Sequence, residues 1–244
     1  MYLSKIIFKK IKFINIGRNN FYYLIKKKGL FVFPSGPGLS TLEREKKYHI
    51  ALKNSDYVFF DSGYFVLLLK ILKKINVLKF SGYLFLNLFF KFLYKKKNIK
   101  IFSIDPSLKS SQINFNFLSK KILIKKVKSY VAPIYKNNFK DKILIKQIKK
   151  FKPNYILINL GGGVQEILGF EIKKNINFNT SIFCTGGAIS YFTKEQAPIN
   201  NFLDKFYLGW LTRILFNPLI FLPRYFKTIN LFWLVLRSKI EVVE

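Results

Sequence analysis

Acidic side chains are scarce in this chain, so each one that stands where chemistry could occur is informative. The 244 residues include 12 Asp and Glu against 43 Lys and Arg. Asp61 ends a run of strand-forming residues and precedes Gly63, a position from which a catalytic base can reach a ligand. Glu166 falls in the first turn of a predicted helix, where it would either cap the helix or act in catalysis. Asp105 precedes Pro106, and we expect it only to begin a turn.

Glycines cluster in three loops, each directly after a predicted strand. The loops contain Gly63, then Gly161, Gly162 and Gly163, and then Gly186 and Gly187. A glycine lets a phosphate approach backbone N–H groups, and the N-terminus of a following helix favours its negative charge. The triple glycine, followed by Gln165 and Glu166, is the best such site. Tight turns in a sheet protein would explain the same glycines. No Walker lysine or G-x-G-x-x-G pattern accompanies them, so a P-loop or dinucleotide fold is not indicated.

Cysteine and histidine each occur once. Cys184 lies inside a predicted strand and is expected in the core, and His49 lies in a polar helix and is expected at the surface. A single cysteine excludes a disulfide scaffold and a cysteine-based zinc site. A single histidine likewise excludes a histidine cluster on a metal.

The elements that must position these residues alternate between strand-like and helix-like segments. This alternation predicts an α/β, Rossmann-like fold with a mostly parallel sheet and flanking helices, in which ligands bind at the carboxyl ends of the strands. We predict strands over residues 30–33, 57–60, 99–104, 129–132, 155–160 and 181–185. We predict helices over residues 41–54, 64–74, 84–94, 111–120, 141–151 and 165–174, and a hairpin or edge strand over residues 6–16.

The C-terminal residues differ from the rest in composition. We predict one α/β domain over residues 1–196 and an aromatic and basic helical tail over residues 197–244. Aromatic residues and arginines on an interrupted helical pattern are typical of a surface that lies on a membrane. Two helices packed on the core would give the same pattern, and both interpretations can hold together. Exposed apolar residues in the tail could also serve a subunit interface, so an oligomer stays open.

The net charge of +31 has two explanations. A genome rich in A and T codons produces abundant Lys, Asn, Ile, Phe and Tyr, and most lysine runs are then solvated surface. The alternative is attraction to an anionic partner such as a membrane, a nucleotide or a nucleic acid. No apolar stretch reaches the roughly 20 residues that a membrane-spanning helix needs. The basic N-terminus lacks an uninterrupted apolar core, so we interpret it as mature protein in the cytoplasm.

Several motifs resemble those of the WecG/TagA/CpsF glycosyltransferases. The stretch NLGGGVQE at residues 159–166 resembles that family's "lG-x-P-x-QE", and DYVFFDSG at residues 56–63 resembles its strand and "aDg". Further matches follow in the family's order, from the "v-x-G" to the closing "P…RY". They are found at residues 80–82, 185–188, 197–198, 209–213, 218 and 224–225.

The chain departs from the family pattern at four places. Gly163 or its neighbour replaces the proline of the first motif, Gly209 replaces the glutamate of "EW", and Ser62 is inserted between the acid and the glycine. Residues 105–107 replace the usual glycines after the strand that ends at Ile104.

The resemblance implies an inverting glycosyltransferase in cell-surface polysaccharide synthesis. It would move an N-acetylmannosamine-type or related hexose from a UDP-sugar to a polyprenyl-diphosphate-linked saccharide, peripherally on the inner face of the cell membrane. Asp61 would be the base, and no metal or cofactor is implied. Arg213 and Arg224 would neutralise the diphosphates. The other implied substrate contacts are Ser35, Gly63, Gly161, Gly162, Gly163, Gln165, Glu166, Gly186 and Gly187.

Two alternatives come from other functional classes. A basic protein rich in aromatics could bind nucleic acid by stacking bases in a basic groove. No RNP, KH or zinc signature appears, so nucleic acid is not the partner we expect. The second alternative is an inactive scaffold built on a transferase fold.

Overall fold

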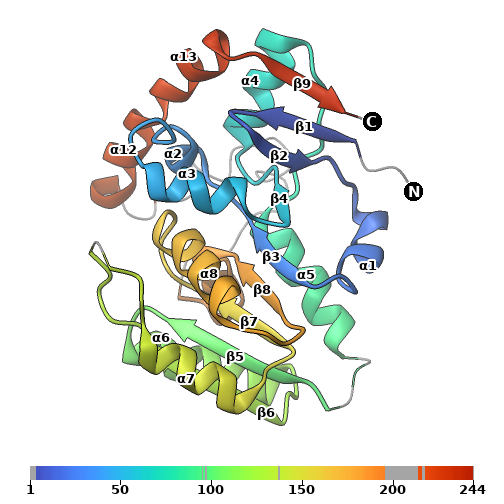
Figure 1. Ribbon diagram of the computed structural model, residues 1–244, viewed down its shortest axis with the longest axis vertical. Coiled ribbons are helices and arrows are strands. Elements are labelled where there is room, and N and C mark those ends of the chain that lie inside the picture. The colour runs from blue at the N-terminus through green and yellow to red at the C-terminus, as the bar shows by residue number, and fades with distance from the viewer. Residues whose placement is uncertain are drawn as a thin grey trace.

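A single twisted sheet organises the computed structural model, which describes residues 4–94, 96, 98–136, 138–195, 214–215 and 218–243. The strand order across the sheet is β6-β5-β7-β8-β3-β4-β2-β1-β9 (Figure 1). The strands are β1 (Lys5–Phe8), β2 (Ile11–Ile14), β3 (Gly29–Val32), β4 (Tyr57–Phe59), β5 (Lys100–Asp105), β6 (Lys126–Val131), β7 (Tyr155–Ile158), β8 (Ser181–Cys184) and β9 (Ile240–Val243).

The strand directions confirm the predicted α/β fold. From β6 through β2 every neighbouring pair is parallel, and only β1 runs antiparallel to its neighbours β2 and β9. The central register aligns Ile156 of β7 with Ile182 of β8, and Ile182 with Leu30 of β3. The carboxyl ends of β7, β8, β3 and β4 therefore meet side by side at one edge of the sheet.

Helices cover both faces of the sheet. One face packs against α3 (Lys46–Lys53), α4 (Gly63–Lys73), α7 (Lys142–Phe151), α8 (Val164–Asn175) and α13 (Ile229–Arg237). The other face packs against α1 (Phe21–Leu24), α5 (Gly82–Leu93) and the π-helix Phe117–Lys121, which continues α6 (Leu108–Asn116). The other helices within the described residues are α2 (Gly36–Leu39), α9 (Ser190–Thr193), α12 (Pro218–Lys227) and the 3-10 turns Arg18–Asn20 and Gly186–Ile189.

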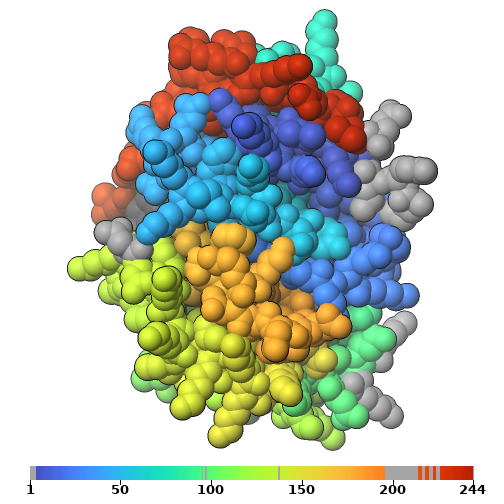
Figure 2. Space-filling model, viewed as in Figure 1, coloured from blue at the N-terminus to red at the C-terminus, as the bar shows by residue number. Residues whose placement is uncertain are grey.

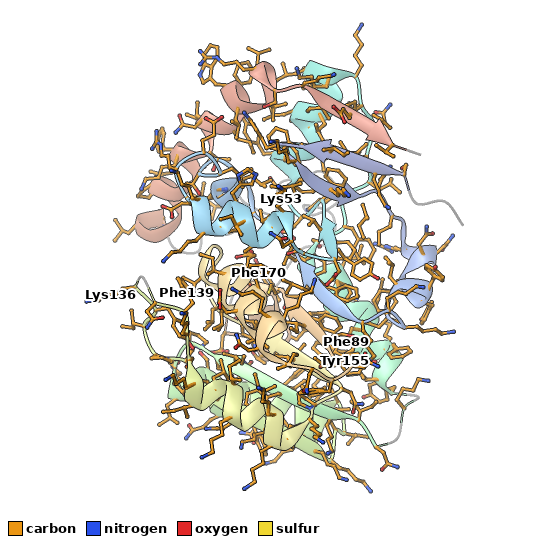
Figure 3. All side chains as sticks on the ribbon, in the orientation of Figure 1. Lys53, Phe89, Lys136, Phe139, Tyr155 and Phe170 are labelled. Carbon is orange, nitrogen blue, oxygen red and sulfur yellow. The ribbon has the colours of Figure 1, made fainter. Side chains whose placement is uncertain are left out.

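Alternation along the central strands divides the core into two layers. Ile156 and Ile158 of β7 enter the layer beneath α7 and α8, whereas Tyr155 and Leu157 enter the layer beneath α5. Successive side chains of a strand point to opposite faces, and a strand buried on both faces is a continuous apolar run. In Figure 3 Tyr155 meets Phe89 of α5, with ring centroids 4.9 Å apart.

The described part of the C-terminal tail packs on the domain with one side. Leu231, Leu234 and Val235 of α13 are buried, while Ile229 and Trp233 are exposed. The chain then ends in β9, which pairs with β1 and lies beside the N-terminal strands in the space-filling view (Figure 2). Both interpretations of the tail therefore agree with α13, and the boundary at residues 196/197 stays a prediction. None of the helices in the described ranges is long and apolar enough to cross a membrane.

Candidate active site at the carboxyl ends of the central strands

Four neighbouring strands deliver most of the predicted site residues to one edge of the sheet. Ser35 follows β3, and Asp61 and Gly63 follow β4. The glycines at 161–163, with Gln165 and Glu166, follow β7, and Gly186 and Gly187 follow β8. In open α/β sheets this edge is where ligands bind. Arg213 lies outside the described residues. Arg224 belongs to α12, but its side chain is not among those that the structure describes.

The loops at this edge touch one another. The backbone N–H of Gly186 donates to Gln165 Oε1 at 2.6 Å, which ties the β8 loop to the β7 loop. A Cβ added at Gly162 would lie 3.5 Å from the Ser35 hydroxyl, so the β7 and β3 loops are also adjacent. A Cβ added at Gly36 would lie only 2.9 Å from Ser62 Oγ, which explains why glycine follows Ser35. The four loops thus form one contiguous cluster.

Asp61 lies between the N-termini of two helices. Ser62 caps α4 by accepting from the backbone N–H of Phe65, and Ser81 caps α5 in the same way. The first backbone N–H of α5, from Gly82, donates to Asp61 Oδ1 at 2.9 Å. The positive ends of two helix dipoles favour the ionised form of a carboxylate. Asp61 is half-buried, so it combines a fixed position with partial access to the edge.

Glu166 has the capping role that the sequence left open. Its carboxylate accepts from the backbone N–H of Gly163 at 2.7 Å, at the start of α8, and from Gln165 Nε2 at 3.1 Å. The side chain is 1% exposed. Burial raises the pKa of Glu166 to about 7, and the charge of Asp61 adds to this rise, although the hydrogen bonds oppose it. Glu166 is therefore a buried carboxyl that can change charge near neutral pH.

The side chain of Gln165 forms its hydrogen bonds within the protein. Its side-chain oxygen accepts from Gly186 and its side-chain nitrogen donates to Glu166, and the residue is 3% exposed. Its backbone oxygen accepts from the Cys184 thiol at 3.2 Å. Cys184 is fully buried, as predicted. In this structure Gln165 joins two loops, so any contribution to ligand binding runs through their positions.

Sequence reasoning missed Tyr48. This residue of α3 is 2% exposed, and within the described residues its hydroxyl has no hydrogen-bond partner. A Cβ added at Gly38 would lie 2.7 Å from that hydroxyl. Burial raises the pKa of Tyr48 well above its usual value, and the charges of Glu166 and Asp61 add to the effect. Tyr48 lies on the buried side of an amphipathic helix, and that pattern alone predicts only a core residue.

The expectation that Asp105 only begins a turn is wrong. Asp105 is the last residue of β5 and is fully buried. It accepts hydrogen bonds from Ser103, Asn114 and Asn159. Proline at 106 does mark the strand end, but the strand runs through Asp105. The hydroxyl of Ser103 in β5 itself and the amides of Asn114 in α6 and Asn159 just after β7 make its burial tolerable.

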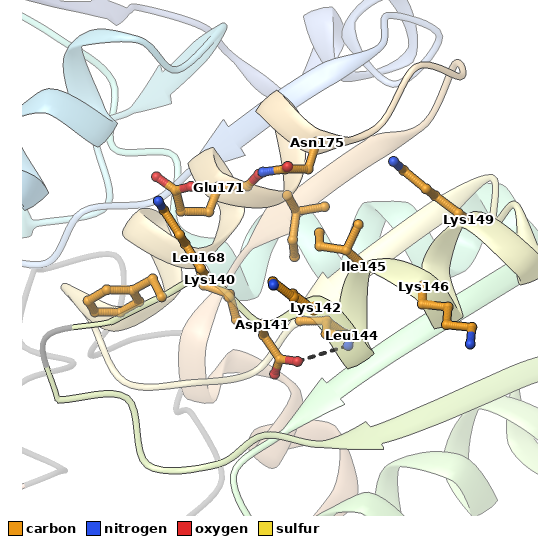
Figure 4. Close-up of a pocket in the computed structure, with 12 residues that line it drawn as sticks. Lys140, Asp141, Lys142, Leu144, Ile145, Lys146, Lys149, Leu168, Glu171 and Asn175 are labelled. Atoms are coloured by element: carbon orange, nitrogen blue, oxygen red, sulfur yellow. Dashed lines mark hydrogen bonds between the residues drawn. The ribbon is translucent and has the colours of Figure 1, made fainter.

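A groove between α7 and α8 lies away from this cluster. It encloses about 500 Å³ and is lined by apolar residues such as Leu144 and Ile172, with lysines along α7 (Figure 4). Asp141 at its end accepts from the backbone N–H of Leu144 at 2.9 Å. None of the predicted site residues whose side chains the structure describes lines the groove. Within the described ranges, no group of three or more His, Cys, Asp or Glu residues gathers that could hold a metal ion.

Comparison with known proteins gives one family. The model of the Glycosyl transferase WecG/TagA/CpsF family matches residues 10–243. No curated protein matches the chain significantly.

Proposed function

The chain belongs to the WecG/TagA/CpsF family of glycosyltransferases, and on this premise we propose its donor, acceptor and catalytic base. Members of this family transfer a sugar from a donor to an acceptor in cell-surface polysaccharide synthesis. We propose that the donor is a UDP-sugar carrying an N-acetylmannosamine-type or related hexose. The proposed acceptor is a saccharide linked to polyprenyl diphosphate. The observation that carries this proposal is the gathering of Asp61 and the open glycine loop at one strand edge.

Asp61 is the proposed general base. Its carboxylate takes the proton of an acceptor hydroxyl while that oxygen attacks the anomeric carbon of the donor. The new carbon–oxygen bond forms as the bond from the anomeric carbon to the diphosphate oxygen breaks, and UDP leaves with the electron pair. The transfer is a single displacement that needs only one carboxylate and forms no covalent glycosyl-enzyme intermediate. The anomeric centre is therefore inverted. The start of α5 supports this role, because the backbone N–H of Gly82 holds the carboxylate of Asp61 in a fixed position.

The glycine loop after β7 is the proposed diphosphate site. Gly161 and Gly162 are exposed, and neither backbone N–H donates a hydrogen bond within the described residues. The N–H of Gly163 is already taken by Glu166. Two exposed N–H groups before a helix N-terminus suit an anionic ligand. Ser35, Gly63, Gly186 and Gly187 border this space, and Arg213 and Arg224 are the proposed cations that offset the diphosphate charge.

The proposed acceptor is a lipid, so the enzyme needs a surface that lies on an anionic membrane. The outer side of α12 and α13 has the composition for this role. Phe226, Ile229 and Trp233 are exposed there, and Arg237 lies 5.7 Å from the centre of the Trp233 ring. Aromatic and basic side chains together favour binding at the interface of an anionic leaflet. We propose that the protein docks peripherally on the inner face of the cell membrane through this side.

Calorimetric titration with UDP, UMP and single-stranded DNA, each at low and high salt, tests the proposal. We expect UDP binding that persists at high salt, because backbone contacts are screened less than surface charge. Gly162→Ala should weaken it, since the added methyl group would project toward Ser35. Gly17→Ala is the control, because among the described residues its methyl group meets only Leu78, at 3.5 Å. Salt-sensitive binding to DNA alone would contradict the proposal and leave a basic protein or an inactive scaffold.

A further inference from the structure

A buried polar network lies next to the glycine loop but plays no part in the proposed transfer step. Three donors converge on one oxygen of Asp105. Ser103 Oγ donates to Oδ1 at 2.9 Å, Asn114 Nδ2 at 2.7 Å and Asn159 Nδ2 at 2.8 Å. Asn159 Nδ2 also donates to Ser103 Oγ at 3.0 Å. The network joins β5, α6 and the end of β7.

The network is costly to build. Asp105 and Ser103 are 0% exposed, Asn114 is 1% exposed and Asn159 is 6% exposed. Within the described residues the Oδ2 atom of Asp105 and the side-chain oxygens of both asparagines are buried without a hydrogen-bond partner. Burial raises the pKa of Asp105, although hydrogen bonding with Asn114, Asn159, Ser103 and, least of the four, Ser111 opposes the rise. A buried polar group with unmet partners normally costs stability, so its presence calls for a function.

Asn159 connects this network to the proposed diphosphate site. Its backbone N–H donates to the carbonyl of Ile104 at 2.9 Å, and its side chain donates to Asp105 and Ser103. The next residues are Leu160 and then Gly161, where the open loop begins. Both the backbone and the side chain at the root of the loop are thus fixed to the end of β5.

We propose that Asp105 is a positioning residue that holds the Gly161–Gly162 backbone in place for the donor diphosphate by fixing Asn159. This inference rests on the proposed nucleotide-sugar donor. A phosphate held by backbone N–H groups requires those groups at a fixed separation, so a displaced loop lowers donor affinity more than it lowers the rate of chemistry. The expected signature of Asp105 is a change in donor KM and UDP dissociation constant with little change in kcat.

Asp141 offers a matched control on another loop at the same edge. It too accepts three hydrogen bonds, from Tyr130 at 2.8 Å, Tyr135 at 2.7 Å and the backbone N–H of Leu144 at 2.9 Å. It caps α7 and makes no contact with residues 159–163 among these bonds. Removing Asp141 therefore perturbs a carboxylate of similar bonding without loosening the glycine loop.

The experiment compares Asp105→Ala, Asp105→Asn and Asp141→Ala with the natural chain. The measurements are UDP affinity by calorimetry, donor KM and kcat, and backbone amide hydrogen exchange over residues 159–163. For Asp105→Ala we expect the UDP dissociation constant and donor KM to rise on the order of tenfold, kcat to stay within about threefold, and exchange to accelerate. Asp105→Asn keeps a side-chain oxygen that can accept from the three donors. It also adds an amide N–H group that can donate to the unpartnered side-chain oxygen of Asn114 or Asn159. The UDP affinity of this variant should therefore stay within about threefold of that of the natural chain.

Other results overturn the inference. Equal UDP affinity in Asp105→Ala and the natural chain contradicts it, as does an equal loss in Asp141→Ala. If Asp105→Ala does not fold, Asn159→Ser supplies the same comparison, because it removes the link to Asp105 and leaves the backbone bond to Ile104. Failure of the natural chain to bind UDP overturns the proposed donor and this inference together. UDP binding that is unaffected by either variant overturns only the role of Asp105.

Discussion

The strand-end cluster and the α7–α8 groove are opposite kinds of surface. The groove has about 500 Å³ of space, an apolar floor and four lysines, whereas the cluster is made of glycine backbone and carboxyls. The acids of the groove are fully occupied, Asp141 by three hydrogen bonds and Glu171 by Lys174 at 2.6 Å. At the strand ends Glu166 is buried, with its pKa raised to about 7. Because the chain has 43 basic residues, a group of lysines is weak evidence for a functional site. A buried acid with a shifted pKa is stronger evidence.

Replacing the proposed base in the strand-end cluster should lower transfer activity far more than any substitution in the groove. Asp61→Asn removes the proton acceptor but keeps an oxygen for the backbone N–H of Gly82, so the fold should persist. We expect transfer to fall by about 10²–10⁴-fold, the usual contribution of a general base. Turnover of a UDP-sugar and the thermal midpoint check this. Turnover at the natural rate in this variant would contradict the assignment of Asp61 and would make the groove a candidate site.

The free energy of unfolding should depend on pH through the titration of Glu166. Its pKa is about 7 when folded against 4.5 in a model peptide, so the folded chain binds this proton more tightly. The stability it contributes is complete below about pH 4.5 and is lost as the pH rises through 7. At about 1.4 kcal/mol per pH unit, the loss amounts to about 3 kcal/mol.

Urea unfolding of the natural chain and of Glu166→Gln, from pH 5 to pH 8, measures this contribution. The neutral amide cannot titrate, so the difference in unfolding free energy between the two chains should change across this interval. Parallel profiles would show that Glu166 is not a buried titrating group and would weaken the contrast with the groove.

Two glycine substitutions separate ligand binding from packing at the strand ends. A methyl group at Gly161 meets nothing within 4 Å among the described residues, so Gly161→Ala should keep the thermal midpoint and weaken UDP binding by roughly tenfold. A methyl group at Gly169 would lie 2.8 Å from both Cys184 Sγ and Leu30 Cδ1. Gly169→Ala should therefore cost about 1–3 kcal/mol of stability by overpacking and leave UDP affinity unchanged. The reverse pattern would mean that the loop is structural.

Substitutions in the groove should have the smallest effect. Lys146 and Lys149 form no ion pair within the described residues, so Lys146→Ala with Lys149→Ala should change stability by less than about 0.5 kcal/mol. Their charges are screened over about 8 Å at physiological salt, so UDP affinity should change by less than about twofold. Transfer that collapses in this double variant would place the active site in the groove.

The prediction from sequence was accurate where local patterns are strong. Ile156 and Leu157 belong to a β-rich run that ends at a glycine loop, and such runs define a buried parallel strand without knowledge of the fold. The prediction failed at Asp105, because the donors that permit its burial come from Asn114 and Asn159, 9 and 54 residues away. Tyr48 was missed for a related reason, since only the fold brings α3 beside Gly38.

The sequence by itself determined the alternation of strands and helices, the glycine loops at strand ends and the family motifs, because each depends on neighbouring residues. Only the tertiary structure decided which strand ends are adjacent, and hence that Ser35 and Gly162 face each other. It also decided that Gln165 and Glu166 bond to the loops around them and that Asp105 is buried. Burial and hydrogen bonding depend on partners distant in the chain, so the charge state and role of a carboxyl emerge only when the sheet has assembled.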